Sequence, residues 1–128
     1  MHTYRVAEAA QLLGVSDDTV RRWIDAGRLE TVPDSDGRRV IQGGQLAAFA
    51  VALAGEPSGP DQTSARNAFP GIVTRVLRGD VVSQVEVQSG PHRLVSLMTT
   101  ESVDDLGLVP GVRANATVKS THVVVELP

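Results

Sequence analysis

Two short polar clusters contain residues that are able to hold a small anion. Ser64-Ala65-Arg66-Asn67 and Val118-Lys119-Ser120 stand at the two ends of a segment rich in Val, Ile and Thr, and Lys119 is the chain's only lysine. Lysine offers a compact ammonium and arginine a planar fork of donors, while serine hydroxyls add neutral donors. Thr99 and Ser102 frame the start of an expected short helix, where free backbone N–H groups favour an anion. Together these residues predict a site for a tetrahedral oxyanion, with Ser64, Arg66, Asn67, Thr99, Ser102, Val118, Lys119 and Ser120 as its members.

The charges of this set favour a dianion. Burying a dianion is prohibitive unless opposite charges and several donors surround it, and Arg66 and Lys119 together balance two negative charges. Phosphate carries protons at neutral pH and needs an acceptor, so a site made only of donors rejects it. Sulfate carries none and is excluded only by cavity size. Glu101 lies nearby in sequence, and we expect it to face solvent.

A second group of candidate residues near the N-terminus predicts DNA binding. Apolar side chains occupy one face of an expected helix over residues 17–26, which leaves its arginines on other faces, and two further arginines lie at an expected hairpin tip. Such a helix fits a major groove, while the hairpin is placed to reach the backbone or the minor groove. The alternative is that these arginines only solvate the surface. The candidate DNA-binding residues are Ser16, Thr19, Arg21, Arg22, Arg38 and Arg39.

The elements that position the DNA-binding residues follow from local signals. Apolar residues at helical spacing predict helices over residues 6–13, 17–26 and 45–53. Gly14 ends the first helix, and Ser16 is a favourable N-cap for the second. The sequence Asp34-Ser35-Asp36-Gly37 between residues 29–32 and 39–42 predicts a hairpin. This order is that of a winged helix-turn-helix.

The C-terminal half has the pattern of a small β-domain. Residues 55–63 contain two prolines and two glycines and predict a flexible linker, so we expect domains at 1–54 and 64–128. Strands are expected at 69–78, 83–88, 93–99, 114–119 and 122–127, with one helix at about 100–106. The fold class is therefore α+β: a winged helix-turn-helix followed by a small five-stranded barrel of the OB type.

Composition excludes several classes of function. The net charge is −3 and no region is strongly basic, so DNA binding must depend on local placement of arginines. The chain has no cysteine, and its three histidines are not spaced as ligands, so no site for a free metal cation is expected. No nucleophile–base pair stands out, and we expect no enzymatic activity. No run is long enough to span a membrane, so the expected location is cytoplasmic. Domains of about 60 residues are marginal alone, which favours a homo-oligomer.

Two families resemble the two halves. Residues 4–16 with Thr19-Val20-Arg21-Arg22-Trp23, continued by Gly27-Arg28-Leu29 and Arg38-Arg39-Val40, resemble the MerR/excisionase-type DNA-binding domain over residues 3–54. The ordered polar clusters, with the loop at residues 105–111, resemble the Mop domain of TOBE type over residues 64–128. The second resemblance implies molybdate or tungstate as ligand. It also implies sites between subunits, with Ser64, Arg66 and Lys119 from one and Thr99 and Ser102 from its neighbour.

Three hypotheses of function follow. The first is a DNA-binding regulator that responds to molybdate or tungstate. The second is an oligomer that stores or buffers molybdate, with weak DNA binding or none. The third is a DNA-binding protein whose barrel only oligomerises. The sequence does not distinguish molybdate from tungstate, because their charges and radii nearly coincide.

Overall fold

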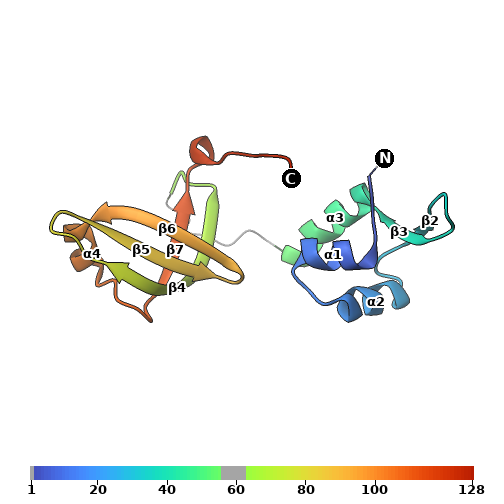
Figure 1. Ribbon diagram of the computed structural model, residues 1–128, viewed down its shortest axis with the longest axis horizontal. Coiled ribbons are helices and arrows are strands. Elements are labelled where there is room, and N and C mark those ends of the chain that lie inside the picture. Colours follow the sequence, from blue (N-terminus) through green and yellow to red (C-terminus); the bar gives the residue numbers. More distant parts are fainter. Residues whose placement is uncertain (1, 56–62) are drawn as a thin grey trace. The chain divides into compact units, whose positions relative to one another are not determined.

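The computed structural model describes residues 2–55 and 63–128, which belong to two compact units, residues 1–57 and 58–128 (Figure 1). The fold class predicted from the sequence is confirmed, with one strand fewer than expected. The predicted linker at 55–63 falls almost wholly on residues 56–62, which lie outside the described residues. No helix in the described ranges is long and apolar enough to cross a membrane.

The N-terminal unit is a helix-turn-helix with a small sheet. Its strands form an antiparallel sheet of order β1-β3-β2, with Thr3 opposite Gln42 and Val32 opposite Val40. The elements are β1 (Thr3–Tyr4), α1 (Val6–Leu13), α2 (Asp17–Asp25), β2 (Val32–Pro33), β3 (Arg39–Gln42) and α3 (Gly43–Ala54). A core of Ala9, Ala10, Val20, Leu29, Ile41 and Leu46 holds them together.

Local chemistry explains the turn between the first two helices. Gly14 has a φ of 70°, the left-handed conformation that ends α1, and Ser16 caps α2 by accepting a hydrogen bond from the amide of Thr19. The strand expected at 29–32 is shorter than predicted. The reason is that Leu29 is buried in the core, and its amide donates to the carbonyl of Trp23 as the chain leaves α2.

The C-terminal unit is a curled antiparallel sheet with one helix against it (Figure 1). The strand order is β6-β5-β4-β7, so β6 and β7 are the two edges of an open half-barrel. Val103 of the helix is buried with Val73, Val85 and Val87. The elements are β4 (Asn67–Leu77), β5 (Val82–Ser89), β6 (His92–Thr99), α4 (Thr100–Leu106) and β7 (Arg113–Val118), followed by a 3-10 turn, η1 (Ser120–His122).

The curl of the sheet depends on β4, which pairs with both neighbours. Its register shifts between Val73 and Arg75, an irregularity that bends the strand. Gly71 permits a close approach, because a Cβ at that position would lie 2.3 Å from the carbonyl oxygen of Gln88. A side chain is therefore excluded at Gly71, where the end of β5 lies against β4.

The fifth predicted strand, residues 122–127, does not form. η1 takes up Ser120–His122, and the residues after it belong to no strand. Val124, Val125 and Leu127 are 80%, 88% and 93% exposed. The pattern of apolar residues is that of a strand, but a strand needs a partner edge, and this chain's own sheet does not supply one.

Candidate oxyanion and DNA-binding sites

Pairing of β4 with β7 brings the first and last polar clusters together. Asn67 lies opposite Val118, and the side-chain amide of Asn67 donates to the carbonyl of Val118 at 3.0 Å. Ser64 and Arg66 precede that pair, and Lys119 follows it directly. Asn67 and Val118 thus fasten the two clusters to each other, 51 residues apart in sequence.

Arg66 and Lys119, the two cations beside the Asn67–Val118 pair, are exposed and differ in their contacts. The Arg66 guanidinium donates to the carbonyl of Thr63 at 3.2 Å, which leaves its other N–H groups available. Lys119 has no carboxylate within 4.0 Å among residues 2–55 and 63–128. Two positive charges therefore lie near one strand end without a neutralising acid in the described structure.

Two other arginines of this unit form ion pairs. Arg78 pairs with Asp104 at 2.9 Å, and Arg93 on β6 pairs with Glu86 on β5. The hydrogen bond from Arg93, assisted by its charge, lowers the pKa of Glu86 below its ordinary value of 4.5. These pairs stabilise the sheet, and they contrast with Lys119.

Thr99 and Ser102 form a hydroxyl pair at the start of α4. The Thr99 hydroxyl oxygen accepts from the Ser102 amide at 3.1 Å, and the two hydroxyl oxygens lie 2.7 Å apart. Each hydroxyl carries one proton, and one of these two protons forms the hydrogen bond within the pair. The O–H of the other hydroxyl stays available. The pair thus presents one O–H donor to a ligand. Glu101 between them is exposed, as expected.

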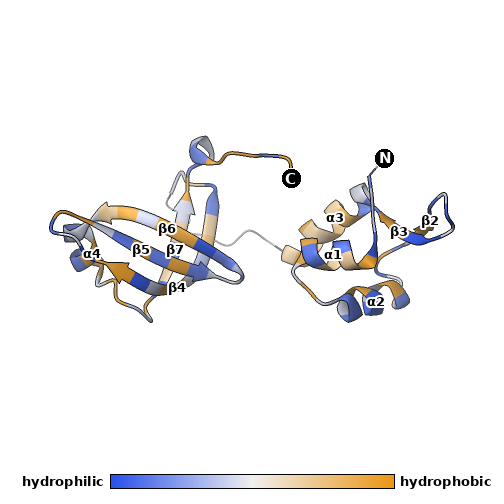
Figure 2. Cartoon of the chain, viewed as in Figure 1, coloured by the Kyte–Doolittle hydropathy of each residue, from blue (hydrophilic) through white to orange (hydrophobic). Residues whose placement is uncertain are grey.

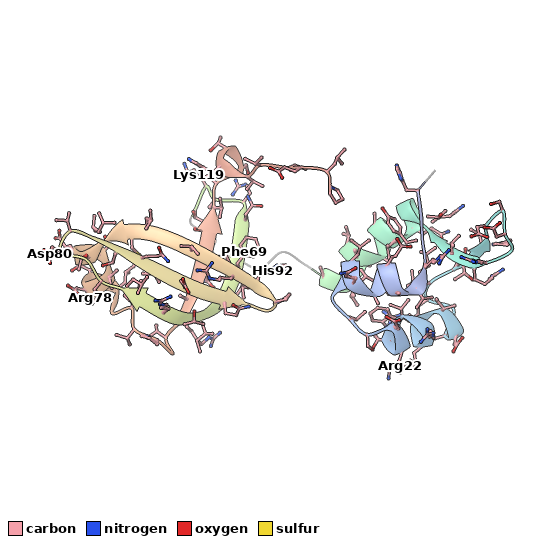
Figure 3. The ribbon with its side chains drawn as sticks, viewed as in Figure 1. Arg22, Phe69, Arg78, Asp80, His92 and Lys119 are labelled. Carbon is pink, nitrogen blue, oxygen red and sulfur yellow. The ribbon has the colours of Figure 1, made fainter. Side chains whose placement is uncertain are left out.

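Within one chain, the hydroxyl pair lies far from the two clusters. Thr99 pairs with Val82, and the Thr100 amide donates to the Val81 carbonyl at 2.8 Å, beyond the C-terminal end of β4. Asn67 begins β4, which is 11 residues long, so the separation is roughly 30 Å at ~3.3 Å per residue. Figure 3 shows Lys119 at one end of the sheet, with Arg78 and Asp80 at the other. The structure therefore brings together the clusters at 64–67 and 118–120 but not Thr99 and Ser102.

A serine outside the predicted set positions the hydroxyl pair. Ser83 is 1% exposed, and its hydroxyl lies 2.7 Å from that of Thr100, which also donates to the Gly79 carbonyl at 2.8 Å. This network fixes the first turn of α4 on β5. The signal in the sequence was a serine at an inward position of a valine-rich strand.

In the N-terminal unit, the predicted polar residues of α2 and of its N-cap contact one another; Arg21 and Arg22 are exposed, and Thr19 is partly buried. The Ser16 and Thr19 hydroxyl oxygens lie 2.9 Å apart, and Arg22 donates to the Thr19 hydroxyl at 3.1 Å. Arg21 pairs with Asp18 at 3.2 Å through one guanidinium nitrogen, so this carboxylate partly offsets its positive charge. Figure 3 shows Arg22 extending from α2.

The hairpin tip is ordered by Asp34, which accepts from the amides of Asp36 and Arg38 at 2.9 and 2.8 Å. Arg38 is exposed beside this turn, whereas Arg39 donates to the hydroxyl and the carbonyl of Thr31, both at 2.9 Å. Arg28, outside the predicted set, stands over the ring of Trp23 at 5.8 Å. The exposed cations at this tip and on α2 belong to the helix-turn-helix unit, and their contact with DNA stays a prediction.

The chain joins a helix-turn-helix unit to a half-barrel with clustered hydrogen-bond donors. The helix-turn-helix domain family matches residues 3–50, and the TOBE domain family matches residues 63–125. The chain belongs to the TOBE family, with a C-terminal domain of the molybdenum-pterin-binding (Mop) type.

Relatives support this membership over the C-terminal half. The chain is 35% identical over 63 residues to molybdenum-pterin-binding protein 3 of Clostridium pasteurianum, covering 48% of this chain and 93% of that protein. It is 35% identical over 83 residues to molybdenum-pterin-binding protein MopA of Rhodobacter capsulatus, covering 64% of this chain but only 31% of that protein. A solved molybdate-binding protein from Sporomusa ovata is 33% identical, with a TM-score of 0.50 over 52% of this chain and 98% of that one.

Proposed function

We propose that this protein is a DNA-binding transcriptional regulator that responds to molybdate or tungstate. Residues 1–54 form the reader in this proposal, 55–63 connect it, and residues 64–128 bind the oxyanion. Membership of the TOBE family and the molybdate named for the Sporomusa relative support the ligand. The helix-turn-helix match supports the DNA partner, and with it a cytoplasmic location.

The ligand site in this proposal is composite. Arg66, Lys119 and the hydroxyls of Ser64 and Ser120 come from one copy, and Thr99 and Ser102 come from a neighbour. The observation that carries this assignment is the placement of the two groups beyond opposite ends of β4. One chain does not close around an ion a few ångströms across with groups that far apart, so two copies are required.

Electrostatics also favour a covered site. In water, a pair of unit charges 4 Å apart contributes about 1 kcal/mol, whereas at an effective dielectric near 20 it contributes about 4 kcal/mol. Lys119, Arg66, Ser64 and Ser120 are all exposed in a single copy. Contact with a second copy would remove water from them and strengthen their attraction for a dianion.

The donor set fits a proton-free dianion. Ammonium, guanidinium and hydroxyl groups all donate, and the nearest acid in sequence, Glu101, faces solvent. Protonated phosphate would find only hydroxyl oxygens, and no carboxylate, as acceptors among these side chains. Size would then separate the larger molybdate and tungstate from sulfate. The site binds without a chemical step, so the protein acts as a binder rather than an enzyme.

Ligand binding would act on DNA through assembly. An oxyanion that binds between copies stabilises the associated form by mass action, and association brings several readers to one operator. A coupling free energy of about 1–3 kcal/mol, typical of such linkage, changes DNA affinity by roughly 5- to 150-fold.

Storage of molybdate is the second candidate function. The pairing of Arg21 with Asp18 and of Arg39 with Thr31 favours it, because Asp18 offsets the charge of Arg21 and Thr31 occupies two of the donors of Arg39. Weak DNA binding would follow, and the C-terminal unit would act alone.

Fluorescence anisotropy with DNA fragments from the protein's own promoter region separates these functions. The regulator requires salt-dependent binding that changes at least fivefold when molybdate or tungstate is added, with sulfate and phosphate as controls. Ligand binding by calorimetry without any change in DNA affinity would instead indicate storage. No heat from either oxyanion would leave the third hypothesis, a barrel that only oligomerises.

A further inference from the structure

Helix α2 carries more negative charge than a helix that only follows a phosphate backbone should. It has two arginines against three aspartates, a net charge of −1. Its inward side is apolar, with Val20 buried and with Trp23 and Ile24 packed against the core. Figure 2 shows hydrophilic and hydrophobic stretches alternating along α2. Phosphates repel carboxylates, so an acid on the outward side of a DNA-reading helix is costly unless the DNA offers it a donor.

Asp18 is the acid at the middle of this outward side. At about 3.6 residues per turn, it points roughly 160° away from the buried Val20. Its side chain is 88% exposed, and that of its partner Arg21 is 59% exposed. The helix is already capped by the hydroxyl of Ser16. Asp18 therefore stands in the first turn, where a recognition helix in the major groove contacts base edges.

The major groove has partners for both members of this pair. A carboxylate accepts a hydrogen bond from an amino group, N4 of cytosine or N6 of adenine, and is repelled by the oxygens of guanine and thymine. Arg21 binds Asp18 through one nitrogen, Nη1. The edge of its guanidinium formed by Nε and Nη2 suits the N7 and O6 acceptors of a guanine.

We propose that Asp18 and Arg21 determine the base specificity of the reader. Arg21 reads a guanine, while Asp18 holds the guanidinium in place and requires an amino group on the adjacent base. On any other sequence the carboxylate meets acceptors and phosphates alone, so Asp18 weakens binding to the wrong DNA. This assignment rests on the proposed function, because it names the bases that the proposed reader recognises.

Arg22 differs from Arg21 in its surroundings. It donates to the Thr19 hydroxyl at 3.1 Å and has no carboxylate within 4.0 Å in the described part of the chain. Its charge is not offset by an acid in contact, which suits a phosphate. The two arginines of α2 thus divide the work, with Arg21 on a base and Arg22 on the backbone.

Selection from a pool of random DNA duplexes tests the role of Asp18 in the full-length protein, with and without molybdate. Asp18→Asn keeps the shape but replaces a group that only accepts with one that also donates. We expect it to raise the affinity for random DNA roughly two- to fivefold and to lose the preference for an amino group at one base pair. Asp25→Asn is the matched control. It removes the same charge from the last residue of α2 and should keep the native base preferences.

Arg21→Ala tests the other member of the pair. It should lower the preference for guanine at the adjacent base pair by roughly 5- to 150-fold. Replacing that guanine with 7-deazaguanine, which lacks the N7 acceptor, should weaken binding by the native protein and leave binding by Arg21→Ala unchanged. A role confined to the stability of the helix would shift the Tm of these variants without altering the selected sequences.

The outcomes separate this assignment from the proposed function. If Asp18→Asn selects the native motif unchanged, or if Asp25→Asn loses the same preference, the assignment is overturned while the proposed function stands. A native protein that binds DNA without enriching any motif also overturns it. No DNA binding by the native protein, with or without molybdate, defeats the proposed function as well.

Discussion

Replacing Lys119 with alanine is the most direct perturbation of the proposed site. Its ammonium is exposed and lies in no ion pair among the described residues, so the substitution should change the free energy of unfolding by less than about 0.5 kcal/mol. In the assembled protein the same ammonium is expected to donate a charged hydrogen bond to the dianion. The loss should therefore appear in ligand binding rather than in folding.

The size of the loss follows from that hydrogen bond. A charged hydrogen bond contributes about 1.5–3 kcal/mol, and each 1.4 kcal/mol is tenfold in Kd, so Lys119→Ala should weaken oxyanion binding by roughly 10- to 150-fold. Lys119→Arg keeps the charge but replaces a compact ammonium with a planar fork of donors. Its Kd for the oxyanion should lie between the values of the native protein and of Lys119→Ala.

Isothermal titration calorimetry with molybdate on the full-length protein measures this difference. Arg113→Ala is the matched control, because Arg113 is an exposed cation at the opposite end of β7 and its removal changes the net charge equally. A loss of similar size in both variants would mean that only total charge matters. A Kd for Lys119→Ala within about twofold of the native value would refute the assignment of Lys119 to the site.

Three further perturbations address positioning, pH and DNA. Ser83→Ala removes a buried partner of the Thr100 hydroxyl and should lower the free energy of unfolding in urea by about 1–3 kcal/mol; no change would mean that the network is redundant. The lowered pKa of Glu86 contributes stability above 4.5 that is lost as pH falls through the lowered value. Arg93→Ala should therefore raise the pH midpoint of acid unfolding followed by circular dichroism, and an unchanged midpoint would contradict this role. Arg22→Ala should weaken DNA binding and reduce the slope of log Kd against log salt by about one in anisotropy titrations, whereas an unchanged slope would place Arg22 off the phosphates.

Elements with local signals could be predicted from the sequence. The helices Val6–Leu13 and Thr100–Leu106 have the predicted bounds, because Gly14 and Gly107 end them in left-handed conformations. Thr99 caps the second through its own hydroxyl. The meeting of residues 64–67 with 118–120 needed only that the first and last strands pair, which places Asn67 opposite Val118.

Features that depend on distant partners could not be predicted. A valine-rich pattern at 122–127 indicates a strand, but whether it pairs is decided by an edge elsewhere, and no edge of this chain's own sheet receives it. Ser83 gave a weak signal, because a serine among valines has the same local pattern whether it is exposed or buried. The sequence placed Thr19, Arg21 and Arg22 on an expected helix, but the pairing of Arg21 with Asp18 required side-chain geometry.

The separation of the hydroxyl pair from the Lys119 end has a consequence for dose response. In the proposed composite site, each copy contributes one Lys119 end and one hydroxyl-pair end, so a closed assembly would have as many binding sites as subunits, and an isolated subunit would have none complete. The oxyanion concentration that fills half of the sites would then depend on how much protein the cell makes. A cell could raise the threshold of its response simply by making less of the sensor.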